Sequence, residues 1–114
     1  MSVCATNGME PGFLDPPGEP IIQGPSLGEI IQRNETVTLE CRSRGGNPLA
    51  QLWWYRGNEK LTSQWHHYAD QAINTYSFVA QPSDNNAVFR CEASNLVTQH
   101  KKTASLRIPV YCKY

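Results

Sequence analysis

The chain has 114 residues, of which 39% are hydrophobic, and ten Lys and Arg residues balance ten Asp and Glu residues. This length supports a single domain with one modest core. A formal net charge of zero is not typical of a nucleic-acid-binding protein, and no apolar run is long enough for a transmembrane helix.

The first segment of the chain is rich in Gly and Pro. Residues 1–18, which include Pro11, Pro16 and Pro17, are expected to form a flexible arm or interdomain linker, and the folded domain is expected at 19–114. Residues 21–31 predict an edge strand with a kink, because Pro25 interrupts them. Residues 1–7 lack a secretory signal, so an extracellular protein of this sequence is expected to be a piece of a longer chain.

Alternating apolar and polar residues then mark a series of short strands. The pattern occurs at 37–41, 51–56, 76–80, 88–93 and 104–110, with a further short strand beginning at Lys60, and turns rich in Gly, Pro and Asn separate them. Residues 62–72 are polar apart from Trp65 and show no alternation. No helical periodicity of useful length is present. About seven short strands of this kind predict an all-β fold, an antiparallel β-sandwich.

The four cysteines are Cys4, Cys41, Cys91 and Cys112. Cys41 and Cys91 both lie in alternating stretches, and a disulfide between them would close a loop worth about 4 kcal/mol in the chain-entropy model. Such a bond implies an oxidising compartment. Cys4 and Cys112 are candidates for a second bridge. The alternatives are that they stay free or pair with cysteines outside this fragment.

Asn34-Glu35-Thr36 is an N-glycosylation sequon that directly precedes the first strong strand. Together with the cysteine pair it predicts a secreted or cell-surface protein. A glycan on Asn34 would mark a surface that is not an interface. Without a glycan, Asn34 is a polar turn residue.

Residues that carry chemistry are sparse. No two cysteines have metal-ligand spacing, and the adjacent His66 and His67 would point to opposite sides of a strand, so no metal site is expected. No nucleophile elbow or phosphate-binding loop is present. We therefore expect no enzyme, no catalytic residue, no cofactor and no small-molecule substrate.

Trp54 lies thirteen residues after Cys41 and is expected to pack its indole on the Cys41–Cys91 disulfide. Alternation selects Trp54 rather than Trp53, because Leu52 shares its face. The predicted core residues are Leu39, Leu52, Trp54 and Phe89.

The run from Cys41 to Ala50, followed by Leu52, Trp54 and the Gly57-Asn58 turn, resembles a C2-type immunoglobulin domain of the nephrin family. Residues 16–22 resemble the proline-led entry of such domains, residues 84–95 the stretch around their second Cys, and residues 106–111 their final strand. The resemblance departs at Cys4, at Cys112 and at Phe89. A Tyr usually stands at the last of these positions, so its hydroxyl hydrogen bond, worth about 1 kcal/mol, is absent.

The resemblance implies an extracellular module, expected to be internal, of a transmembrane cell-adhesion receptor at the plasma membrane. The partners it implies are other immunoglobulin-superfamily receptors of the roughest/kirre type and the neighbouring domains of the same chain. Because the first domain usually makes the contact, an internal domain would act as a spacer or a lateral contact. The alternative is a soluble, secreted immunoglobulin-type binding protein.

Alternation also leaves one sheet face exposed, with Trp53 and Tyr55 at its centre. Trp, Tyr and Arg are enriched at binding hot spots, so one hypothesis is that this face binds a protein. The alternative is that Arg90 or the strand after Leu61 covers the two rings and no partner exists. Trp65 is interpreted as a plug over an end or edge of the sandwich, or else as a recognition residue. The face comprises Gln51, Trp53, Tyr55, Arg90 and Glu92, with Val88 beside them and Ser105 and Arg107 at the rim.

Overall fold

The computed structural model describes residues 14–25 and 29–111. Cys4 and Cys112, the candidates for a second disulfide, lie outside these residues. No helix in the described part of the chain is long and apolar enough to cross a membrane.

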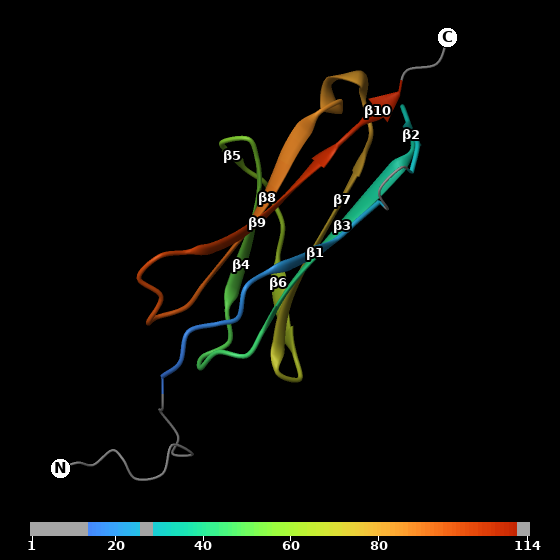
Figure 1. The fold of residues 1–114 in the computed structure, drawn as a ribbon. Coiled ribbons are helices and arrows are strands. Elements are labelled where there is room, and N and C mark those ends of the chain that lie inside the picture. Colours follow the sequence, from blue (N-terminus) through green and yellow to red (C-terminus); the bar gives the residue numbers. More distant parts are fainter. Residues whose placement is uncertain (1–13, 26–28, 112–114) are drawn as a thin grey trace, which may run out of the picture.

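Two four-stranded antiparallel sheets stack face to face (Figure 1). The first has the order β1 (Ile21–Gln23), β3 (Thr36–Arg44), β7 (Gln71–Val79) and β6 (Trp65–Tyr68). The second has the order β5 (Glu59–Lys60), β4 (Gln51–Arg56), β8 (Ala87–Ser94) and β9 (Lys102–Ile108). A 3-10 turn, η1 (Pro82–Asp84), connects β7 to β8. The predicted all-β antiparallel sandwich is confirmed.

A short parallel pair adds to this architecture. β2 (Ile31–Gln32) pairs with β10 (Val110–Tyr111), so the expected edge strand over 21–31 is divided between two sheets. The chain leaves the first sheet at Gly24, where an added Cβ would lie 2.9 Å from Leu39 and 3.0 Å from Leu106. A side chain at this position would therefore have to displace the methyl groups of two leucines.

The polar segment 62–72 also differs from its expectation, because it contains β6 and the start of β7. β6 pairs with β7 and so belongs to the first sheet, opposite the sheet that holds Trp54. His66 lies opposite Ile73, and His67 lies within 3.0 Å of the Ala50 carbonyl oxygen. The two imidazoles therefore point to opposite sides of β6. Because both are polar, the alternation was invisible in the sequence.

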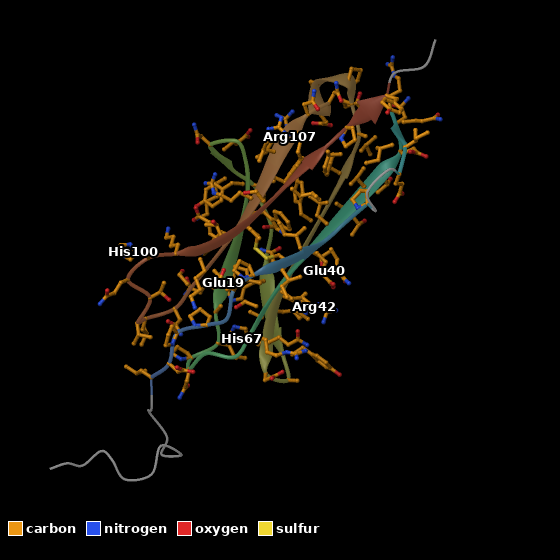
Figure 2. The ribbon with its side chains drawn as sticks, in the orientation of Figure 1. Glu19, Glu40, Arg42, His67, His100 and Arg107 are labelled. Carbon is orange, nitrogen blue, oxygen red and sulfur yellow. A yellow bond between two sulfur atoms is a disulfide. The ribbon has the colours of Figure 1, made fainter. Side chains whose placement is uncertain are left out.

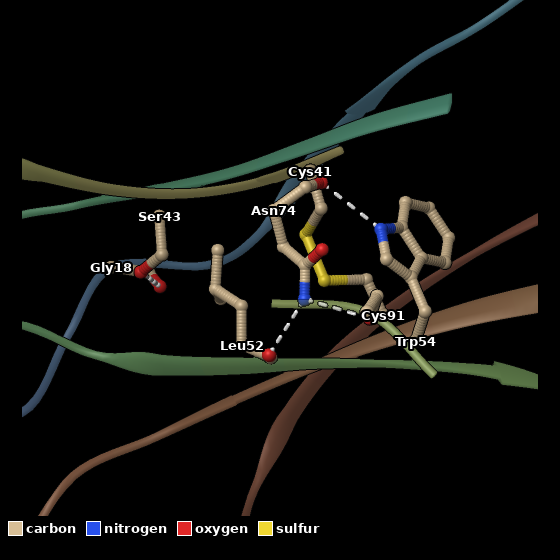
Figure 3. The surroundings of a disulfide bond; sticks show 8 residues. Gly18, Cys41, Ser43, Leu52, Trp54, Asn74 and Cys91 are labelled. Carbon is tan, nitrogen blue, oxygen red and sulfur yellow. Dashed lines mark hydrogen bonds between the residues drawn. A yellow bond between two sulfur atoms is a disulfide. The ribbon is translucent and has the colours of Figure 1, made fainter. Parts of the chain in front are cut away.

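The core lies between the two sheets around the disulfide that joins Cys41 to Cys91 (Figure 3). This bond links β3 to β8, as the sequence predicted. The structure places Leu39, Leu52 and Trp54 at 0% exposure, and Phe89 at 1%. Phe89, which stands where such domains usually have a Tyr, stacks on Phe78 with ring centroids 5.0 Å apart. Its ring therefore packs in the core, although it has no hydroxyl to form a hydrogen bond.

The segment that leads into β1 is tied to the domain, although composition assigned residues up to 18 to a flexible arm. The Asp15 amide donates to the Asn47 carbonyl at 2.9 Å and the Gly18 amide donates to the Arg44 carbonyl at 2.9 Å. Pro17 is fully buried. These backbone bonds and the burial of one proline ring hold residues 15–18 against the loop before β4. The boundary stays a prediction for residues 1–13.

Candidate protein-binding face

The outer face of the β5-β4-β8-β9 sheet carries the residues that alternation placed there. β4 and β8 pair so that Trp53 lies opposite Glu92 and Tyr55 lies opposite Arg90. β8 and β9 pair so that Arg90 lies opposite Ser105. This register brings all five predicted residues onto one surface, which we call the aromatic face: Gln51, Trp53, Tyr55, Arg90 and Glu92, with Lys60, Ser105 and Arg107 beside them.

Trp53 is held between two side chains. The Lys60 ammonium lies 3.8 Å from the centroid of the Trp53 ring, and the Trp65 ring meets it edge-on with centroids 4.7 Å apart. A cation over a tryptophan contributes about 0.5–1 kcal/mol at an exposed site. The strand after Leu61 thus contacts Trp53 through Trp65, as the alternative to a binding face expected, and Arg90 contacts Tyr55 in the same way. Both rings nevertheless remain only half-buried.

Tyr55, like Trp53, has a cation against its ring. The Arg90 guanidinium lies 4.5 Å from the centroid of the Tyr55 ring and donates to Glu92 Oε2 at 3.1 Å. Lys101 approaches the other Glu92 oxygen at 3.6 Å. Arg90 also donates to the Gly57 carbonyl at 3.2 Å, which ties it to the β4–β5 turn. Tyr55 thus lies beside an ion-paired cluster of two cations, Arg90 and Lys101, that share the Glu92 carboxylate.

The rim of this face is polar and open. Ser105 and Arg107 are exposed on β9, and Arg107 donates to the Asn86 carbonyl at 3.4 Å. Figure 2 shows Arg107 on the β8–β9 side of the sandwich, with Glu40 and Arg42 on the β3 side. A central aromatic area within a polar rim is the usual anatomy of a protein interface.

The opposite outer face has a different character, because an ion pair between Glu40 and Arg42 lies among Thr and Ser side chains there. Arg42 donates through Nε to Glu40 at 2.9 Å and reaches Gln71 at 3.4 Å. The hydrogen bond to Glu40, followed by its negative charge, raises the pKa of Arg42. Arg42 is thus paired within its own sheet.

A shallow groove continues the aromatic face toward the loops before β4 and after β8. The sequence allowed two interpretations of Trp65, a plug over the sandwich or a recognition residue. In the structure Trp65 covers the edge of β4 beside Trp53 and also lines this groove. Leu96 in the groove is 76% exposed. The groove is lined by Pro48, Leu49, Gln51, Trp65, His67, Ser94, Asn95 and Leu96.

Lys60 is the member of the face that sequence reasoning missed. Gly57 and Asn58 form a two-residue hairpin loop, which pairs Tyr55 with Lys60. A two-residue loop fixes its register, so the position of Lys60 beside β4 was available from the Gly57-Asn58 signal. Its reach over Trp53 is a diagonal contact between paired strands.

The remaining predicted positions lie apart from this face. Asn34 is exposed in the turn between β2 and β3, on a different sheet edge. In the part of the chain that the structure describes, no group of three or more His, Cys, Asp or Glu side chains is placed to hold a metal ion.

Comparison with known proteins gives the family of this fold. The sequence model of a protein family described as "Immunoglobulin domain" matches residues 19–95. Human nephrin is 33% identical over 103 residues, which are 84% of this chain and 8% of nephrin. Rat nephrin is 31% identical over 101 residues, again 8% of that protein. The chain therefore spans about 8% of the length of the curated relatives it matches first.

Solved structures share the fold. The ectodomain of mouse nectin-like molecule 4 has a TM-score of 0.73 at 23% identity, covering 87% of this chain and 35% of that one. The structure of Rst D1-D2 has a TM-score of 0.71 at 26% identity, covering 86% and 51%. Dpr2 Ig1-Ig2, solved in complex with DIP-Theta Ig1-Ig3, has a TM-score of 0.55 at 15% identity, covering 85% and 32%.

Proposed function

The chain belongs to the immunoglobulin domain family, and from this premise we propose that it is one extracellular module of a nephrin-type adhesion receptor at the plasma membrane. Similarity to nephrin over 84% of the chain supports this assignment. Adhesion proteins of this family are generally non-enzymatic. We accordingly assign no catalytic residue, cofactor or small-molecule substrate.

The aromatic face is the proposed contact surface. The observation that carries the proposal is that Trp53 and Tyr55 are both half-buried and both held by a neighbouring cation, Lys60 and Arg90. Rings fixed before binding lose little side-chain entropy when a partner covers them. Such preorganised aromatic side chains are typical of binding hot spots.

The proposed partners are other immunoglobulin-superfamily receptors, with those of the roughest type as the first candidates. The likeness to Rst D1-D2 supports this choice. One structural neighbour, Dpr2, is itself solved in complex with another protein that carries immunoglobulin domains. Neighbouring domains of the same parent chain are the second proposed set of partners.

The proposal predicts that Tyr55→Ala weakens binding about 30-fold, the effect of truncating a hot spot worth about 2 kcal/mol. The probes are an immobilised ectodomain of a roughest-type receptor and a second copy of this chain, measured by biolayer interferometry and sedimentation. Tyr68→Ala is the matched control, because Tyr68 is an exposed Tyr (67%) on β6 of the other sheet. It should bind as the parent chain does.

A second pair of variants separates binding from folding. Ser105→Arg adds a long cation beside Arg90 on the aromatic face, whereas Thr75→Arg adds the same side chain to the outer face of the other sheet. Both positions are exposed, so both variants should melt close to the parent. Binding lost only in Ser105→Arg supports the face, and equal binding by both variants contradicts it.

A spacer is the competing function. A domain that only holds others apart would bind neither probe and would remain monomeric at millimolar concentration. That result would overturn the binding proposal and leave an architectural module. A soluble, secreted binding protein is the further alternative, and it would lack an apolar run of about 20 residues in the full-length sequence.

A further inference from the structure

The turn between β2 and β3 exposes a sequon whose two functional side chains are free. Asn34 and Thr36 are both exposed, and neither side chain engages another of the described residues. Asn34 has a φ of 73°, a left-handed conformation that Asn tolerates well. Its backbone is fixed, because the Asn34 amide donates to the Ala80 carbonyl at 2.7 Å. A sugar on Asn34 Nδ2 would therefore break no hydrogen bond of that side chain, and the backbone that carries it is held in place.

Exposed apolar side chains surround this turn. Tyr111 is 55% exposed, Ile30 is 59% exposed and Val79 is 50% exposed. The Arg33 amide donates to the Tyr111 carbonyl at 3.1 Å, and Thr36 pairs with Val79. Tyr111 and Val79 therefore lie within two residues of the sequon across a strand pairing, and Ile30 lies four residues before Asn34 in the sequence. Tyr111 and Val79 are thus exposed apolar side chains within reach of a sugar on this turn.

We propose that Asn34 carries an N-linked glycan that covers the end of the sandwich around Tyr111. The donor is an oligosaccharide on a lipid diphosphate. A bond forms between its anomeric carbon and Asn34 Nδ2, the bond from that carbon to the diphosphate breaks, and the lipid diphosphate and one amide proton leave. The glycan occupies the β2–β10 end and stays off the aromatic face, so it goes beyond the proposed binding function.

The first test measures the mass of the 114-residue chain secreted from a eukaryotic host, before and after an amidase that releases N-linked glycans. The parent chain and Thr36→Ser should lose the mass of one glycan, because Ser retains the hydroxyl that the sequon needs. Thr36→Ala should show the bare mass throughout. It is preferred to Asn34→Gln, which puts a less tolerant residue at positive φ, but Asn34→Gln serves if Thr36→Ala is not secreted. A bare parent chain overturns the proposal.

The second test asks whether the glycan covers Tyr111. Tyrosine nitration followed by peptide mapping gives the modification rate of Tyr111 relative to Tyr68, which lies at the opposite end of the sandwich in β6 (Figure 1). This ratio should rise severalfold when the glycan is released, and it should be equally high in Thr36→Ala. A ratio that is the same with and without the glycan refutes the covering role. Neither measurement involves a binding partner, so its failure is distinct from a failure of the proposed function.

Discussion

Two buried polar residues, Ser43 and Asn74, shape the interior as much as the disulfide does. The Trp54 indole donates to the Asn74 carbonyl at 3.0 Å, and the Asn74 amide donates to the Leu52 carbonyl at 2.9 Å (Figure 3). Asn74 lies on β7 and Leu52 and Trp54 lie on β4, so these bonds cross between the sheets. Ser43 donates to the Gly18 carbonyl at 2.8 Å. Directional bonds of this kind fix how the sheets sit against each other.

Asn74→Ala is expected to lower the free energy of unfolding by about 2–3 kcal/mol, because it opens a cavity and leaves the Leu52 carbonyl without its donor. Urea denaturation at equilibrium measures the change. Ser63→Ala is the control, since it removes only the 3.1 Å bond from the Asn74 amide to Ser63. It should cost about 0.5–1 kcal/mol. Equal losses in both variants would contradict the role of the bond between the sheets.

Among the elements, the loop after β8 holds three segments together through one side chain. The Asn95 amide nitrogen donates to the Asp15 carbonyl at 2.7 Å and to the Pro48 carbonyl at 2.9 Å. Its oxygen accepts from the Val97 amide at 3.1 Å and from the Thr98 hydroxyl at 3.0 Å. Every polar atom of the Asn95 side chain is therefore used. The entering chain and the loops at this end of the sandwich form one unit.

Asn95→Ala should release the entering segment without unfolding the sandwich. Hydrogen exchange of the Asp15 and Asn47 amides, which bond each other's carbonyls, should accelerate about fivefold, as expected for losing about 1 kcal/mol of local stability. Exchange in β3 and β8 should stay unchanged. Leu96→Ala, at an exposed neighbouring position, is the control and should leave the Asp15 and Asn47 rates as they are. Unchanged rates in Asn95→Ala would show that the loop does not hold the segment.

The elements also show what sequence patterns reveal. β3, β4 and β8 were predicted because one face of each meets the core and the other meets water, which produces alternation. β6 was hidden because His67 is polar although its ring bonds the Ala50 carbonyl. The inward position of Asn74 was equally hidden, since the two acceptors of its side-chain amide, on Leu52 and Ser63, are distant in sequence. The aromatic face followed from alternation, whereas the packing of Trp65 against Trp53 depends on where a separate sheet brings β6.

For the whole molecule, the Cys41–Cys91 bond is the largest single contribution that can be removed cleanly. The double variant Cys41→Ala with Cys91→Ala should lose about 4 kcal/mol of unfolding free energy, because the open chain gains the entropy of a 50-residue separation. Total stabilities of about 5–15 kcal/mol make this loss large. Guanidinium denaturation measures it, and the parent chain under reducing conditions should match the variant. A shift below about 1 kcal/mol would contradict the entropic account.

The parallel pairing of β2 with β10 has a mechanical consequence. The described chain begins and finishes at opposite ends of the sandwich (Figure 1), so a force that pulls its two ends apart would act lengthwise. β2 would then be drawn toward the N-terminal side and β10 toward the C-terminal side, and Ile31, Gln32, Val110 and Tyr111 would slide past one another. Hydrogen bonds between two strands that are pulled along their length in opposite directions must break together. In a hairpin that is pulled open from one end, they break one by one. Because β1 lies between the N-terminus and β2 and is paired with β3, this force would reach the β2–β10 ladder only after β1 separates from β3. From that point the four residues of the ladder would oppose further extension together.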